Sequence, residues 1–111
     1  MQPTEEQVVN KWISLKNSAA SRKLKFDLTV LSVRNLLRAE KCFYTGVSFN
    51  SKMRGLGKTI DRIDPNKGYV RGNVVACTDG YNQAKAQWEK LDKKGVRAMI
   101  RQLKIIEERM K

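Results

Sequence analysis

Apolar residues recur at helical spacing in the first third of the chain. Val8 opens a stripe that later fades into polar residues, which predicts a helix from just after Thr4 to Ala20 or Ser21. Thr4 and Gln7 have the spacing of a capping box, which marks the start of this helix. A second stripe predicts a helix over residues 30–39, and the threonine before it is a suitable cap.

The pattern changes in the middle of the chain, where β-branched and aromatic residues replace the helical stripes. Residues 42–49 predict a tight turn or short hairpin, and residues 50–58 predict an exposed loop. The alternating run 59–64 predicts a strand, which a turn at 65–68 connects to a return strand that begins at residues 69–70.

Two further helices are expected toward the C-terminus. The first begins at residue 78 or 79 and carries Asn82 and Lys85, and the second has an apolar stripe from Val96 to Met110. This stripe either packs on the first helices or forms the seam of a homodimer through the C-terminal helix. The pattern predicts an α+β fold in a single domain, residues 1–111, with N-terminal helices at 1–40, a central core at 41–90 and a C-terminal helix at 91–111.

Composition narrows the possible functions. The 111 residues include 23 Lys and Arg against 11 Asp and Glu, and this net charge of +12 indicates a polyanionic partner such as nucleic acid. The chain has no histidine and only two cysteines, which excludes imidazole bases, His-ligated zinc and a four-thiolate zinc site. It has neither an apolar run that could span a bilayer nor a secretory signal, so we expect an intracellular, cytoplasmic protein with no membrane partner.

One region has a specific motif pattern: CFYTG at residues 42–46, DRIDPNKGYVRGNVV at 61–75 and NQAK at 82–85. Its spacing resembles that of the HNH nucleases, especially the small phage-type proteins related to recombination endonuclease VII. The resemblance covers about residues 26–85 and implies a β-hairpin followed by a helix, the ββα-metal core of that family, in a treble-clef-like arrangement. It also implies hydrolysis of phosphodiester bonds in DNA with one Mg²⁺ or Mn²⁺ ion, in a setting such as a phage-infected bacterial cell.

The resemblance implies roles for individual residues. Asp61 on the strand and Asn82 on the helix match the metal ligands of the family, and both offer the hard oxygen atoms that Mg²⁺ prefers. Asn73 matches the asparagine that braces the loop between hairpin and helix. Lys85, one turn beyond Asn82, is expected to contact a phosphate.

The chain departs from the family pattern at the general base. The residue after the strand aspartate is usually a histidine, but here it is Arg62, which keeps its proton at neutral pH and can only stabilise charge on the phosphate. Asp64 is the nearest substitute base. Strand alternation places it on the opposite face from Asp61, unless Pro65 bends the end of the strand. A metal-bound hydroxide without a protein base is the other route.

The zinc knuckles of some relatives are also incomplete. Cys42 is the one thiolate in the matching positions, so no zinc is expected, and Cys42, Tyr44 and Tyr81 are expected to fill that space by packing. Cys77 is expected to be a small buried apolar residue. Four aromatic residues lie within apolar stripes and are expected in the core: Trp12, Phe26, Phe43 and Trp88.

Six basic residues lie close together in sequence around the proposed site, against two acids, and this clustering predicts a contact surface for phosphates. They are Lys52, Arg54, Lys58, Arg62, Lys67 and Arg71. The expected partner is DNA, and the sequence leaves open branched DNA, ordinary duplex, single strands or RNA.

Each site residue also has an ordinary structural interpretation. Asp61 and Asp64 can form simple ion pairs with basic residues of the hairpin. A catalytically inactive HNH scaffold that binds nucleic acid, or acts as an inhibitor, is the alternative to an endonuclease, because the histidine is absent. A module that blocks a host nucleic-acid enzyme by protein contacts is a third hypothesis.

Overall fold

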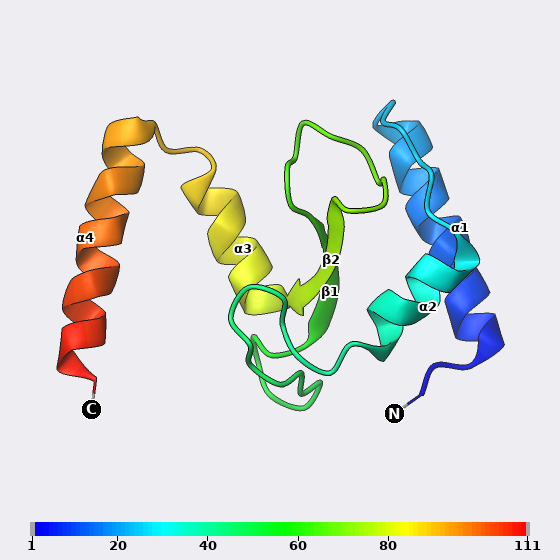
Figure 1. Ribbon diagram of the computed structural model, residues 1–111, viewed down its shortest axis with the longest axis horizontal. Helices are drawn as coiled ribbons and strands as arrows, with labels where there is room; N and C mark the ends of the chain where they lie inside the picture. Colours follow the sequence, from blue (N-terminus) through cyan, green and yellow to red (C-terminus); the bar gives the residue numbers. More distant parts are fainter. Residues whose placement is uncertain (1, 111) are drawn as a thin grey trace.

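The computed structural model describes residues 2–110, and in that range the fold is mixed α+β, with four helices and a two-stranded antiparallel sheet (Figure 1). The elements are α1 (Glu5–Ser21), α2 (Val30–Arg38), β1 (Lys58–Arg62), β2 (Val74–Thr78), α3 (Asp79–Trp88) and α4 (Lys93–Arg109). The four predicted helices are confirmed, with ends that differ by a few residues. No helix between residues 2 and 110 has the length and apolar character needed to cross a membrane.

Both N-terminal helices begin in complete capping boxes. The backbone N–H of Gln7 donates to Thr4 Oγ1 at 3.1 Å, and the Thr4 N–H donates to the Gln7 side chain at 2.8 Å. Thr29 and Ser32 repeat this exchange at the start of α2, at 3.0 and 2.9 Å. These reciprocal bonds satisfy N–H groups that have no partner within the helix, which explains why the helices start where the sequence predicts.

The buried core lies where α1 and α2 meet the hairpin. It consists of Val8, Leu15, Ala19, Leu28, Val33, Tyr69 and Val74. Trp12 and Phe26 pack against this core edge to face, with ring centroids 5.7 Å apart, and the Trp12 indole N–H donates to the carbonyl of Leu28 at 2.7 Å. The core therefore joins the N-terminal helices to the hairpin.

The expectation that Phe43 is a core residue is wrong, because 61% of its surface is exposed. Its backbone N–H donates to the carbonyl of Ala76 at 2.9 Å, which holds this segment along β2. The next residue, Tyr44, turns its ring onto Tyr81 in a stacked pair with centroids 4.5 Å apart. Both residues lie in a turn, and the Phe43 ring packs edge to face on the Tyr44 ring, with centroids 5.2 Å apart, so Phe43 covers Tyr44 and itself stays exposed.

The hairpin differs from the prediction in its second strand. The predicted return strand at residues 69–70 is wrong, because the strand that pairs with β1 is β2, in the register that sets Asp61 opposite Val75. Tyr69 instead bridges to the segment before α2. Its N–H donates to the Lys25 carbonyl at 2.9 Å, and its carbonyl accepts from the Asp27 N–H at 3.1 Å.

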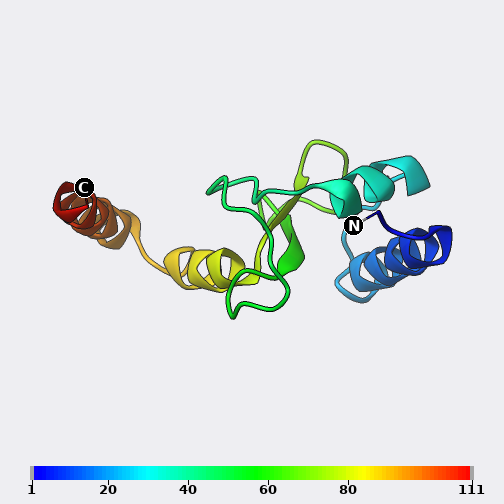
Figure 2. The same ribbon diagram turned by 90° about the horizontal axis from the view of Figure 1, so that it is seen from below.

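Helix α4 lies apart from the rest of the chain, at the end opposite to α1 (Figures 1 and 2). It begins at Asp92, whose carboxylate accepts from the Gly95 N–H at 2.8 Å. None of its residues from 93 to 109 is buried. The sequence left two alternatives for this apolar stripe, packing on the N-terminal helices or the seam of a homodimer. The structure does not adopt the first, because α4 does not pack on α1 or α2.

Two glycines of the hairpin loop have different physical roles. A Cβ at Gly68 would lie 2.3 Å from the carbonyl oxygen of Lys25, so only glycine allows the loop to approach this segment. Gly72 has open space around its Cβ position but a φ of +88°, which strains any residue with a side chain.

We predict that Gly68→Ala destabilises the protein more than Gly72→Ala does. The change at Gly72 costs about 1 kcal/mol of backbone strain. The change at Gly68 must separate the loop from Lys25, which breaks two backbone hydrogen bonds and costs about 3 kcal/mol or more. Urea denaturation measures both free energies of unfolding, and equal losses would mean that the contact between the loop and Lys25 contributes little.

Candidate functional site

A cavity of about 270 Å³ lies between β1, the hairpin loop and α3. Its charged and amide lining residues are Asp61 and Arg62 of β1, Asn82 and Lys85 of α3, and the residues directly after α3 and α1, Glu89 and Arg22. Four of the residues that the sequence singled out, Asp61, Arg62, Asn82 and Lys85, therefore line one cavity. The local fold explains this arrangement, because α3 begins directly after β2 and folds back along the sheet (Figure 1).

Asp61 is a nearly buried carboxylate with two partners on the same oxygen. Its side chain is 11% exposed, and its Oδ2 accepts a hydrogen bond of 2.6 Å from the Tyr44 hydroxyl. The same oxygen lies 3.3 Å from the ammonium of Lys85. Burial, followed by the bond to Asp61 and the charge of Asp61, raises the pKa of Tyr44, so the phenol stays neutral and remains a donor.

Lys85 is held by three protein groups. Besides Asp61, its ammonium donates to the carbonyl of Arg62 at 3.0 Å and to Glu89 Oε2 at 3.2 Å. Burial lowers the pKa of Lys85, but the bond to Glu89 and the charge of Asp61 outweigh burial, so the pKa is raised. Lys85 is therefore charged at neutral pH, and a phosphate must compete with these partners to reach it.

The donor set of the cavity fits a magnesium ion that is shared with a phosphate. Asp61 and Glu89 offer carboxylate oxygens and Asn82 a carboxamide oxygen, which are the hard ligands that Mg²⁺ takes. Within residues 2–110, no three or more His, Cys, Asp or Glu side chains gather closely enough to hold a metal by themselves. Mg²⁺ is commonly bound by one or two carboxylates, several waters and substrate phosphates, so a small protein donor set suits it.

Two guanidinium groups meet at Tyr69 beside the cavity. Arg62 donates from Nη1 to the carbonyls of Pro65 at 2.6 Å and Lys67 at 3.2 Å, and its guanidinium lies 5.3 Å from the Tyr69 ring centroid. Arg22 donates to the Tyr69 hydroxyl at 3.2 Å. Arg62 thus fixes the shape of the hairpin loop and also lines the cavity. Arg22 adds a second guanidinium to the cavity, and the sequence did not predict this residue as part of the site.

Asn73 closes the base of the hairpin loop. Its side-chain oxygen accepts from the N–H of Asp64 at 2.9 Å, and its amide donates to the carbonyls of Gly68 at 2.9 Å and Asp64 at 3.2 Å. Asp64 itself uses its carboxylate to accept from the Asn66 N–H at 2.9 Å. Asp64 is not among the residues that line the cavity, so the structure does not bring this candidate base to Asp61.

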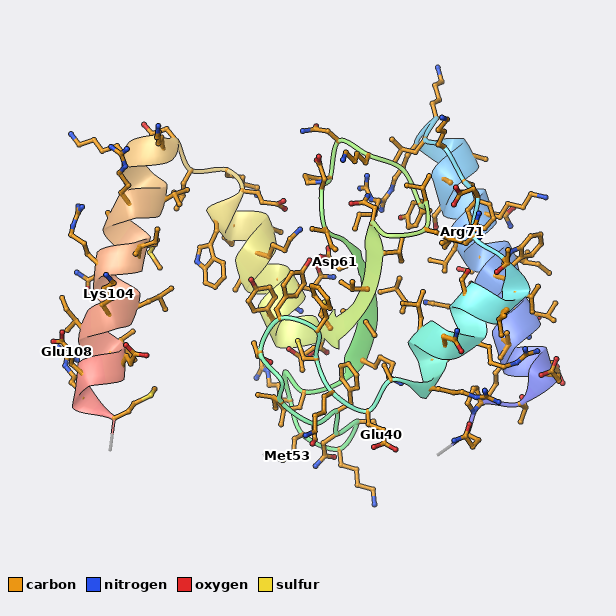
Figure 3. The ribbon with its side chains drawn as sticks, in the orientation of Figure 1. Glu40, Met53, Asp61, Arg71, Lys104 and Glu108 are labelled. Atoms are coloured by element: carbon orange, nitrogen blue, oxygen red, sulfur yellow. The ribbon has the colours of Figure 1, made fainter. Side chains whose placement is uncertain are left out.

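The other basic residues form two groups at opposite ends of the sheet. Lys52 and Arg54 lie in the loop before β1, while Lys67 and Arg71 lie in the hairpin loop after it. Figure 3 shows these two ends at Met53, which lies between Lys52 and Arg54 in the chain, and at Arg71.

Lys58 is not in either group. Its ammonium donates to the Leu37 carbonyl and lies 5.0 Å from the Phe49 ring centroid. Burial lowers the pKa of Lys58. These contacts turn its charge toward the interior of the protein, and we expect no direct role for it in phosphate contact.

The two cysteines pack beneath the site. Cys42 and Cys77 are both buried and unbridged, and the Thr78 hydroxyl donates to Cys42 Sγ at 3.8 Å. Burial raises the pKa of Cys42, but hydrogen bonds from Thr45 and Thr78 outweigh burial and lower it to about 7. Burial and the charge of Asp61 raise the pKa of Cys77 to about 12. The predicted burial of Cys77 is confirmed. Of the three residues expected to fill the knuckle space, Tyr44 and Tyr81 stack on each other and Cys42 is buried.

A larger cavity of about 410 Å³ lies between α2 and β2, and Phe43, Lys41 and Arg71 are among its lining residues. Its walls are mostly apolar and contain no Asp or Glu. Without a carboxylate this cavity offers no charged ligand for a divalent cation, so the smaller cavity, which has two carboxylates, is the candidate site for chemistry.

Comparison with known proteins gives one relative. A protein of Enterobacteria phage T4, described as an uncharacterized 29.0 kDa protein in the dda-modA intergenic region, is 32% identical to this chain over 71 residues. The match covers 64% of this chain, which spans only 29% of the length of the phage protein. No family model matches the chain, and no solved structure matches it.

Proposed function

We propose that this protein is a metal-dependent, HNH-like endonuclease that hydrolyses phosphodiester bonds in DNA, with β1, β2 and α3 as its ββα-metal core. The observation that carries the proposal is the cavity that gathers Asp61, Asn82, Arg62 and Lys85 from two different elements. The net charge of +12 supports a nucleic acid as the substrate. The match to a phage protein agrees with the phage-type character of the motif.

Asp61 and Asn82 would hold the ion together with a phosphate of the substrate. When bound, Mg²⁺ or Mn²⁺ supplies positive charge that polarises the phosphate and stabilises the leaving oxygen. The Tyr44 hydroxyl fixes the Asp61 carboxylate through Oδ2. Arg22, Arg62 and Lys85 offer cationic donors to the other phosphate oxygens, because all three line the cavity.

Glu89 replaces Asp64 as our candidate for the general base. It is the second carboxylate of the cavity, whereas Asp64 is fixed in the hairpin loop by its bond to Asn66. The Glu89 side chain is 36% exposed, so it can exchange protons with solvent. In this role it accepts the proton of the attacking water, while Lys85, 3.2 Å away, holds the carboxylate in place.

One observation favours the inactive scaffold as a second candidate. The ammonium of Lys85 lies 3.3 Å from the carboxylate oxygen of Asp61, where its positive charge opposes a metal ion. If this pair never opens, the protein retains the hairpin and the basic surface but has no metal site. The two candidates make opposite predictions for metal-dependent cleavage.

We predict that the protein cleaves plasmid or branched DNA only with Mg²⁺ or Mn²⁺, and that chelator stops the reaction. Asp61→Asn keeps the shape of the side chain but removes the charge that holds the ion, so the rate should fall by about 100-fold or more. Binding of DNA should persist or strengthen, because removing an acid reduces the repulsion of phosphate. Gel assays of cleavage and of binding measure the two effects separately.

Asp64→Asn is the matched control, since it changes a hairpin carboxylate outside the cavity, and it should leave the rate within a few-fold. Glu89→Gln should lower the rate, because an amide cannot accept the proton of the attacking water. If the wild type cleaves no DNA or RNA form with either metal but still binds, the inactive scaffold replaces the endonuclease.

We also predict that binding of DNA weakens steeply between about 50 and 200 mM salt, because the protein displaces condensed counterions from phosphates. Replacing Lys67 and Arg71 by Ala should reduce the slope of log affinity against log salt by about two, and replacing Lys52 and Arg54 should do the same. Lys58→Met, a control whose charge is turned inward, should leave the slope unchanged. A flat salt dependence of the wild type would contradict the proposed phosphate contacts.

A further inference from the structure

Helix α4 exposes a complete apolar face. Val96, Ile100, Leu103, Ile106 and Met110 are each between 40% and 70% exposed. Figures 1 and 2 show α4 standing away from α1, α2 and the sheet in both views. A continuous row of large apolar side chains in water is the mark of an interface that something covers.

The sequence of α4 makes a lone helix unstable. The helix has 17 residues, close to the length below which even alanine-rich helices are marginal in water. It also contains Gly95 and four β-branched residues, Val96, Ile100, Ile105 and Ile106, which lower helix propensity. The helix therefore needs packing on its apolar face, and the described part of the chain supplies almost none.

The spacing of the apolar residues specifies the kind of partner. Val96, Met99, Leu103, Ile106 and Met110 follow each other at intervals of three, four, three and four residues, which is the a/d pattern of a coiled coil. A membrane surface is a poorer match, because α4 has none of the aromatic residues that commonly anchor interfacial helices. The pattern fits another helix with the same repeat.

The charges of α4 specify the orientation in which it pairs with a partner helix. Five cations lie in the first part of the helix, from Lys93 to Lys104, while both of its acids, Glu107 and Glu108, lie in the last turn. Lys93 and Glu107 are fourteen positions apart, two heptads, so both flank the same side of the apolar row. In an antiparallel pair of α4 helices, Lys93 of each copy lies beside Glu107 of the other. A parallel pair would instead place the cationic ends together.

We propose that α4 is a dimerisation helix that pairs antiparallel with α4 of a second copy of this chain. The pair is related by a two-fold axis, so the same apolar row on each copy covers the other. If the proposed nuclease function holds, the dimer contains two such cavities. The pairing itself does not depend on that function.

The first test measures oligomeric state without nucleic acid. Sedimentation equilibrium of the full chain at micromolar concentration should give a dimer, and Leu103→Glu, in the centre of the apolar row, should give a monomer. Arg101→Glu, on the opposite side of the helix, is the matched control and should remain a dimer. Circular dichroism and the urea midpoint of the Leu103→Glu monomer should show that the hairpin and N-terminal helices are still folded.

The second test checks orientation by exchanging charges. Lys93→Glu and Glu107→Lys should each raise the dissociation constant of the dimer by about tenfold, because each places like charges across the pair. The double variant should recover the affinity of the wild type, since the exchange restores both pairs in an antiparallel dimer. A parallel dimer would show no recovery.

Three results would overturn the proposal: a wild type that is monomeric at all concentrations, a dimer that survives Leu103→Glu, or a wild-type monomer that instead sediments with anionic vesicles. None of these results depends on cleavage, so failure of the dimer and failure of the nuclease function are separate outcomes.

Discussion

A sheet of two strands with five residues each cannot fold alone in water, and the structure of this protein follows from how the chain covers it. The core built on α1 and α2 covers one side, and α3 covers the other (Figure 1). The contact that fixes the first side is the approach of Gly68 and Tyr69 to Lys25 and Asp27. The same contact brings the end of α1, and with it Arg22, to the cavity.

On the side of the sheet that α3 covers, the charged residue Asp61 occupies a position where an apolar residue could pack without needing a partner. Asp61 is buried against α3 and keeps its charge favourable through the Tyr44 hydroxyl and the Lys85 ammonium. Buried ion pairs often contribute little net stability, because removing both ions from water costs several kcal/mol. An apolar pair of similar size often stabilises a fold equally well, so the presence of both charges here supports the proposal of a functional site.

The sequence predicted those elements that depend on neighbouring residues. The capping boxes at Thr4 and Thr29 marked both N-terminal helices, and the helix carrying Asn82 and Lys85 began where expected. The return strand was misplaced because Tyr69 pairs with residues 25–27, a contact that local pattern does not reveal.

The residues of the candidate site also divide into those that the local sequence predicts and those that depend on tertiary contacts. Asp61, Arg62, Asn82 and Lys85 were identified from motif spacing and do line one cavity. Arg22 reaches that cavity only through the tertiary arrangement of α1, and no sequence signal marked it. Glu89 lies four residues after Lys85, and this helical spacing was a signal that could have identified it. The pairing of Lys85 with Asp61 was also unforeseen, since both were assigned to outside ligands.

The central claim is that the cavity at Asp61 is where a divalent ion binds. The most direct test is to titrate Mn²⁺ into isotope-labelled protein, with and without a short DNA duplex, and to follow paramagnetic broadening of the backbone amide signals. The account predicts broadening centred on residues 60–62 and 82–86, strengthened by DNA and lost in Asp61→Asn. Broadening centred on other acids such as Glu107 and Glu108, or none at these positions even with DNA, would contradict it.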